Sequence, residues 1–378
     1  MALPVHCITG VETLPMEAAT VGLQWDLPRA VVVRHRLDVA AGTLTRVVSD
    51  ATGVLEQETT EVEHLCASCA LREDIIPTLE RLAALDRWDS IVAHLPVGME
   101  ASQLCRMITA DADLASDLRV AGVVMAGERA SLPDLLVTDD LLVERDLHTS
   151  RTDRRGVAEV AARLVEYADV VALFDDESAP AASDAGGAGS PAVDAAAGEA
   201  LVRTLARPGA LVVSGWPGLR HADLITGLHH HDTSEEWVDD VFTATMGDLD
   251  GEHVWRLDLM TTDPLDPSRF LDRLEDLGTG PHRTRGFFWM PTRPDDVVAW
   301  QGAGGQVSVG VTETWAGRPR HSRIVVTGLF GSGDDRETIR SAFLDSLVRD
   351  DDRVHRGIRW QVEEDGLEPW LGPIPGAA

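Results

Sequence analysis

The chain has 378 residues, a length that favours two domains or one large α/β unit with an appendage, and 44% of its residues are hydrophobic, ample for burying such cores. Its formal net charge of −30 argues against direct binding to DNA or bare RNA, because an acidic surface repels a polyanion. The charge instead favours a basic protein or a metal ion as the partner.

The N-terminus lacks the charged-then-apolar plan of a signal peptide, and no apolar stretch approaches the roughly 18 residues that span a bilayer. We therefore expect a cytoplasmic protein that does not associate with membranes. Its 4 cysteines are too few for a disulfide framework in a chain of this size, so the close pair Cys66 and Cys69 favours metal binding, with redox chemistry as the alternative.

The first half of the chain alternates short apolar runs with amphipathic stretches, the pattern of βαβ units and a parallel sheet. Apolar spacing predicts helices over residues 75–85 and 154–167. Residues 178–200 are rich in Ala, Gly, Ser and Pro, which predicts a flexible surface insertion in a domain that we place at residues 1–220. Strands are predicted at 4–9, 30–34, 90–94, 121–125, 170–174 and 210–214.

A segment rich in His, Asp and Glu at residues 221–251 indicates a linker between the domains. The remaining residues, 252–378, predict a separate and smaller α+β domain. Its strands are expected at 254–259, 286–290, 306–311 and 323–329, and its helices at 267–277 and 336–348.

Three sequence motifs occur in an informative order. The stretch HLCASCALREDIIPTL at 64–79 runs into a predicted strand, EYADVV at 166–171 begins another, and DPLDPSRF at 263–270 precedes RTRGFFW at 283–289. They resemble the CobW-like family of metal-linked P-loop GTPases, in which C-x-C-C leads into T-L-R-E-D and the second domain carries P-x-x-P-x-R-F and R-x-K-G-F-x-W. The resemblance implies an α/β fold: a P-loop-NTPase-like parallel-sheet domain followed by a smaller α+β CobW-type C-terminal domain.

The phosphate-binding loop departs from that family. A working loop reads G-x-x-x-x-G-K-[ST], in which the lysine reaches the phosphates and the hydroxyl holds Mg²⁺. Here Gly10 occupies the first position, and Pro15, Met16 and Glu17 occupy the last three. Proline removes a donor, methionine removes the charge and glutamate repels a phosphate, so Gly10 is the one residue of the loop that we expect to retain a role in cofactor binding.

The guanine-reading loop is also absent. Its N-K-x-D sequence aligns with FDDE at residues 174–177, and the whole chain contains neither lysine nor asparagine, so no other alignment restores these residues. GTP hydrolysis is therefore not expected, and we interpret the chain as a pseudo-GTPase. An enzyme with an atypical nucleotide site is the alternative.

Candidate zinc ligands cluster around the C-x-x-C pair. Two thiolates at this spacing can hold one tetrahedral zinc ion, and His64 lies two residues before Cys66. The family's architecture implies that His94, which aligns with an acidic residue of the family, or Cys7 completes the set. The alternative is that Cys66 and Cys69 are ordinary small residues at the start of a helix.

The consecutive histidines His229, His230 and His231 form a second candidate site. Histidines in a flexible segment bind Zn²⁺ loosely, because no preformed geometry holds them. An exposed polar loop without a metal is the equal alternative.

The function that we predict is a CobW-like protein of zinc homeostasis or the zinc-starvation response. The LCASCALRED stretch and the lack of lysine resemble actinobacterial members that recruit a hibernation factor to the ribosome, which implies a non-hydrolysing adaptor with a ribosome-associated protein partner. A zinc metallochaperone that uses Cys66 and Cys69 is the alternative from a different class.

Overall fold

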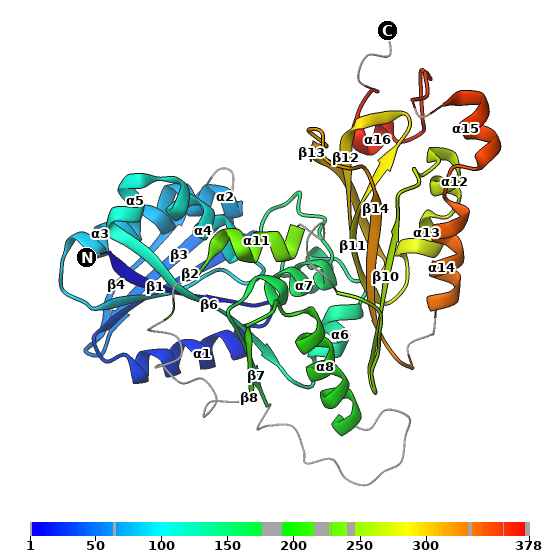
Figure 1. Cartoon of the computed structure of the whole chain (residues 1–378). Helices are drawn as coiled ribbons and strands as arrows, with labels where there is room; N and C mark the ends of the chain where they lie inside the picture. The colour runs from blue at the N-terminus through cyan, green and yellow to red at the C-terminus, as the bar shows by residue number, and fades with distance from the viewer. Residues whose placement is uncertain are drawn as a thin grey trace. The chain divides into compact units, whose positions relative to one another are not determined.

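The computed structural model describes residues 2–62, 66–175, 191–214, 227, 229–239, 246–331, 335–357 and 359–374. The chain folds into two compact units, one formed by Met1–Leu135 with Asp140–Val238 and the other by Leu136–Asp139 with Asp239–Ala378. Each unit has its own sheet (Figure 1). Each also has its own hydrophobic core. Within the described residues, no helix is long and apolar enough to cross a membrane.

The first unit is built on an 8-stranded sheet with the strand order β4-β3-β2-β5-β1-β6-β7-β8. Neighbouring strands from β2 to β8 in this order run parallel, whereas β3 and β4 extend the sheet as antiparallel strands at one edge. The parallel-sheet α/β domain predicted from the sequence is therefore confirmed. The strands are β1 (Leu3–Thr9), β2 (Ala30–Asp38), β3 (Thr43–Asp50), β4 (Gly53–Glu61), β5 (Ser90–His94), β6 (Leu118–Glu128), β7 (Val170–Phe174) and β8 (Leu211–Ser214).

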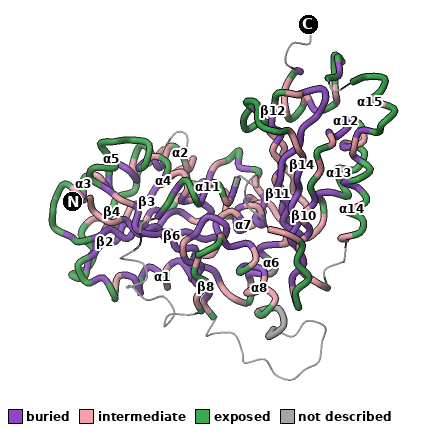
Figure 2. The backbone as a smooth tube through the Cα atoms, in the orientation of Figure 1, coloured by how far each residue is buried: buried purple, intermediate pink, exposed green. Residues whose placement is uncertain are grey.

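The central strands of this sheet are buried on both faces, as Figure 2 shows. In β1, Val5 and Cys7 belong to one core and Ile8 to the core on the other face, because successive side chains of a strand alternate between faces. The helical elements are α1 (Thr13–Asp26), α2 (Ala67–Ala70), the π-helix η1 (Leu71–Ile75), α3 (Ile76–Ala84), α4 (Ala101–Ala110), α5 (Ala112–Asp117), α6 (Leu132–Val137), the 3₁₀-helix η2 (Leu142–Arg145), α7 (Val157–Tyr167), α8 (Pro191–Leu205) and α11 (His231–Asp239).

Two connecting segments differ from the sequence-based expectation. In the flexible insertion expected at 178–200, residues 191–200 belong to α8, and residues 178–190 lie outside the described part of the chain. In the linker expected at 221–251, residues 231–239 form α11, and Val238 joins the core of the first unit. The first unit therefore ends at Val238 rather than at residue 220, because apolar burial continues into the histidine-rich segment.

The second unit is a 6-stranded antiparallel sheet with the order β13-β12-β11-β14-β10-β9, which confirms the predicted α+β domain. Aromatic side chains fill its core: the Phe270 ring lies 5.0 Å from that of Phe288 and 5.7 Å from that of Trp300. The elements are β9 (Leu249–Asp250), β10 (Val254–Thr261), α12 (Pro267–Asp272), α13 (Leu274–Gly278), β11 (His282–Met290), β12 (Arg293–Ala303), β13 (Gln306–Thr314), β14 (Ser322–Leu329), α14 (Arg336–Asp345), α15 (Asp350–Arg356) and α16 (Glu368–Leu371).

Candidate functional site

The carboxyl ends of β1 and β5 meet at one edge of the first unit's sheet, where α/β proteins commonly bind their ligands. Backbone hydrogen bonds join the loops that follow these strands: Gly98 N donates to Gly10 O at 2.9 Å, and Leu95 N donates to Ile8 O at 3.0 Å. The buried Thr9 hydroxyl donates to Met99 O at 2.6 Å. These hydrogen bonds therefore hold the two loops against each other at this edge of the sheet.

The loop after β1 is short because helix α1 already begins at Thr13. Met16, which aligns with the phosphate-binding lysine of the family, is fully buried and packs on Gly10, where an added Cβ would lie 2.9 Å from Met16 Cγ and 2.5 Å from Ala126 O. The Glu12 carboxylate accepts hydrogen bonds from Glu128 N at 2.9 Å and Ser131 Oγ at 2.6 Å. An apolar side chain and a carboxylate thus lie beside Gly10, at the position that the sequence predicts for a cofactor.

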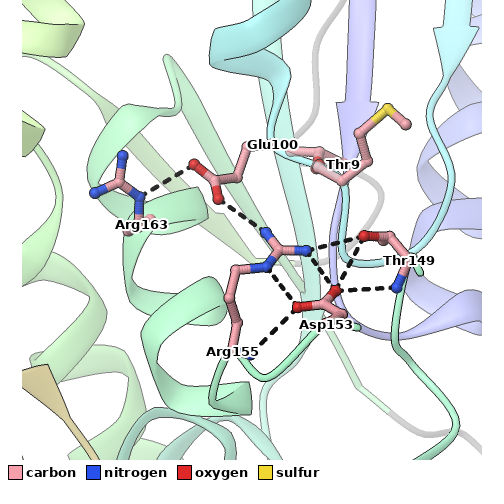
Figure 3. A network of polar contacts seen from close by, with 7 residues as sticks. Thr9, Glu100, Thr149, Asp153, Arg155 and Arg163 are labelled. Carbon is pink, nitrogen blue, oxygen red and sulfur yellow. Dashed lines mark hydrogen bonds and ion pairs between the residues drawn. The ribbon is translucent and has the colours of Figure 1, made fainter. Parts of the chain in front are cut away.

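A charged network supports the loop after β5 (Figure 3). Arg155 donates to Glu100 Oε1 at 3.0 Å and to Asp153 Oδ2 at 2.9 Å, and Arg163 donates to Glu100 Oε2 at 3.1 Å. Burial alone would raise the pKa of Asp153, but hydrogen bonds from Arg155 and from the Thr149 amide lower it well below its ordinary value. The ionised network therefore ties this loop to helix α7, which carries Arg163.

His94, at the end of β5, has a defined tautomer. The Thr20 hydroxyl donates to Met16 O at 2.7 Å, so it accepts from His94 Nδ1, which lies 2.8 Å away. Burial lowers the pKa of His94 to about 4, so the ring is neutral at pH 7 and its Nε2 carries a lone pair. A ring held through Nδ1 with a bare Nε2 has the form that metal-binding histidines take.

Cys66 and Cys69 lie at the start of α2, and both are partly exposed. Cys66 caps this short helix, because its Sγ accepts a hydrogen bond from Cys69 N at 3.2 Å. A hydrogen bond to Cys66 is the largest cause that raises the pKa of the Cys69 thiol, and burial adds to it. The cap supplies a structural role for Cys66 and also keeps the two thiols at one end of the helix.

The predicted ligand set is not assembled within the part of the chain that the structure describes. No group of three or more His, Cys, Asp or Glu side chains there is placed to hold a metal ion. His64 lies outside the described residues, and His94 makes its hydrogen bond to α1. A zinc site made by Cys66, Cys69, His64 and His94 therefore stays a prediction.

The histidine run is partly buried, which corrects the expectation of a loose polar loop. His229 contacts Asp169 Oδ2 through Nδ1 and Tyr167 OH through Nε2, both at 2.9 Å, and the Tyr167 hydroxyl also lies 2.7 Å from His231 Nδ1. Only His230 of the three is exposed. Sequence reasoning missed this cluster, because its partners lie about sixty residues away and lack a recognisable spacing.

A buried thiol belongs to the same cluster. Burial alone would raise the pKa of Cys105, but hydrogen bonds from Cys7 and His229 lower it to about 5. Burial alone would lower the pKa of His229, but hydrogen bonds to Asp169 and Cys105 raise it to about 9. Cys105 therefore belongs to the same buried group as His229, Asp169 and Tyr167, and His229 lies just before α11 along the chain.

Comparisons with known proteins find one domain family and several relatives. Residues 255–347 match the cobalamin synthesis protein cobW C-terminal domain, so the second unit contains this domain. The zinc chaperone Rv0106 of Mycobacterium tuberculosis H37Rv and the uncharacterized protein Mb0109 of Mycobacterium bovis are each 27% identical to the chain over 381 residues, covering 90% of it and 87% of the relative. The match to the crystal structure of the Zn(II)-bound YjiA GTPase of E. coli covers 92% of this chain and 100% of the YjiA chain. The sequence identity is 16% and the TM-score is 0.36. The chain is thus a distant homologue of a zinc chaperone.

The neutral His94 predicts a loss of stability in acid. Its folded pKa of about 4 lies below the ordinary value of 6.5, so its contribution to stability is present above pH 6.5 and is lost as the pH falls through 4. The free energy of unfolding of the first unit should fall between pH 7 and pH 4, and His94→Gln should make this fall smaller by about 2–3 kcal/mol. Urea unfolding followed at Trp88, by fluorine NMR of fluorotryptophan-labelled protein, reports on the first unit alone.

The matched control is His282→Gln, because burial also lowers the pKa of His282, in the second unit, to about 4. This substitution should leave the unfolding reported by Trp88 unchanged. Identical acid sensitivity in the wild-type protein and in His94→Gln would show that His94 is not held neutral in the folded protein.

Proposed function

We propose that this chain is a cytoplasmic zinc-binding protein of zinc homeostasis that carries the ion with Cys66 and Cys69 and does not hydrolyse GTP. The observation that supports this most is the cap of α2, in which Cys66 Sγ accepts from Cys69 N and both thiols stay partly exposed. The homologous zinc chaperone aligns with 90% of the chain, which favours the role of a carrier.

Two thiolates supply half of a tetrahedral zinc shell. We propose His64 and His94 for the remaining positions, since His94 presents a bare Nε2 and His64 precedes Cys66 by two residues. Both thiols are partly exposed, so a client protein can reach the ion and remove it.

The side chains of the loop after β1 support the part of the proposal that this chain does not hydrolyse GTP. Charge-assisted contacts to phosphate need cationic side chains or free backbone N–H groups, and the buried Met16 and the Glu12 carboxylate offer neither. The chain contains no lysine that could replace the missing one.

Zinc affinity should depend on the two cysteines. Replacing both in the double variant Cys66→Ser and Cys69→Ser should weaken the tight component roughly 100-fold or more, because thiolates are the strongest zinc ligands available. Competition with a chromophoric chelator measures this affinity, and the wild-type protein should hold about one ion per chain.

Two single variants serve as controls for this measurement. Ser68→Ala changes the exposed residue between the cysteines and should leave the affinity unchanged, and His230→Gln should remove only a weak component. Tight zinc binding that survives in the double-serine variant would place the site elsewhere.

GTP and ATP should bind no tighter than about 1 mM, because each lost charge-assisted contact ordinarily supplies about 1.5–3 kcal/mol. Calorimetry in the presence of Mg²⁺ measures this affinity directly. A micromolar dissociation constant for GTP would contradict this part of the proposal and favour the enzyme with an atypical nucleotide site.

A second candidate is the non-hydrolysing adaptor that recruits a ribosome-associated hibernation factor. The net charge of −30 favours it, because an acidic surface accelerates encounters with basic proteins. An adaptor needs no stoichiometric zinc, whereas a carrier binds about one ion tightly.

If the adaptor role holds, the protein should co-sediment with ribosomes from zinc-starved cells. The association should weaken as salt is added, because the Debye length is only about 8 Å at physiological ionic strength. Isolated ribosomal RNA should not replace the ribosome in the assay. A protein that stays in the supernatant at low and at high zinc would leave the carrier as the one candidate.

A further inference from the structure

The first unit contains a pocket whose wall shares His94 with the proposed zinc site and is otherwise formed by other residues. Its volume is about 640 Å³, within the range of small-molecule sites, and it lies at the carboxyl ends of β2 and β5 beside the first turns of α1. Its wall includes residues 34–37 of β2 and residues 146–148. This is the sheet edge at which parallel α/β domains bind ligands.

The pocket wall is more basic than the molecule around it. It carries Arg34 and Arg36 beside the histidines His35, His94 and His148. The acidic side chains that line it are Glu17 and Asp146, in a chain with 63 acidic residues and 33 basic ones. Two guanidinium groups on one strand of such an acidic protein mark a site for an anion rather than for a metal.

The guanidinium groups of this wall are incompletely used by the protein. Arg34 donates through Nε to Glu17 at 3.1 Å and through one terminal nitrogen to Ser49 Oγ at 3.3 Å. Arg36 is exposed and makes no ion pair with a described residue. Arg36 and the second terminal nitrogen of Arg34 can therefore donate to an oxyanion without breaking the Arg34–Glu17 pair.

A buried histidine completes the wall. His35 is 3% exposed; its Nε2 lies 2.9 Å from Asp74 Oδ1, and its Nδ1 has no hydrogen-bond partner among the described residues. Asp74 also accepts from Arg46, so η1 is tied to β2 and β3 behind the pocket. The strand that carries both arginines is therefore held in place before any ligand arrives.

We propose that this pocket binds a small molecule through a phosphate or other oxyanion group held by Arg34 and Arg36. Guanidinium groups bind oxyanions with paired, charge-assisted hydrogen bonds. The site differs from a phosphate loop, because side chains of β2 rather than glycine-loop amides supply the donors. The donors Arg34 and Arg36 are not proposed zinc ligands, so the proposal stands on residues outside the zinc shell although His94 lines the pocket as well.

Inorganic phosphate is the probe. Titration calorimetry of zinc-free protein, at an ionic strength kept constant with chloride, should detect millimolar binding. Arg36→Gln should weaken this affinity about fivefold or more, because charged hydrogen bonds to the anion are lost. Glu17→Gln should tighten it, because that substitution removes a competing carboxylate and frees Arg34.

The control is Arg29→Gln, which removes an exposed arginine at the opposite end of β2 that pairs with Asp89. This variant should bind phosphate as the wild-type protein does. Opposite effects of the Arg36 and Glu17 substitutions cannot arise from a general loss of folding. Absence of phosphate binding, or equal binding by the wild-type protein and the Arg36→Gln and Glu17→Gln variants, would overturn the proposal.

Discussion

The contact between Met16 and Gly10 decides what the carboxyl edge of the parallel sheet can bind. Helix α1 begins only three residues after Gly10, and its first turn places Met16 in the core where a phosphate loop would hold a charged side chain. The loop after β5 is then hydrogen-bonded to Gly10 and supported from behind by Arg155 and its carboxylate partners. The edge keeps the geometry of a ligand-binding α/β domain, and we propose that His94 and the arginines of β2 are its binding groups.

Polar contacts hold the histidine-rich segment at residues 229–231 against the first unit. The buried His229 imidazole contacts the Asp169 carboxylate and the Tyr167 hydroxyl, so these groups satisfy one another where an unpaired charge would be costly. The first unit extends as far as Val238 and includes this cluster. His229 and His231 therefore have structural partners within the unit. Zinc chemistry is therefore concentrated at Cys66 and Cys69 in our account.

The central strands of the parallel sheet were predictable because they are buried on both faces and read as continuous apolar runs. The two antiparallel strands β3 and β4 were missed. Most residues of β4 are exposed and polar, so this edge strand carries no apolar pattern. The site was harder to predict. Sequence spacing singled out Cys66 and Cys69 as candidate ligands, which stay a prediction. The partners of His229 and of Arg155 come from distant segments, and only the folded chain brings them together.

Hydrogen exchange at residues 17–23, whose amides lie beyond the first turn of α1, tests the account most directly when it is measured with and without GTP and Mg²⁺. If α1 occupies the place of the phosphate loop, the amides of these residues exchange slowly in the free protein, and nucleotide does not change their rates. Rapid exchange in the free protein, followed by protection when GTP and Mg²⁺ are added, would show that the loop opens to receive phosphate and would contradict the account.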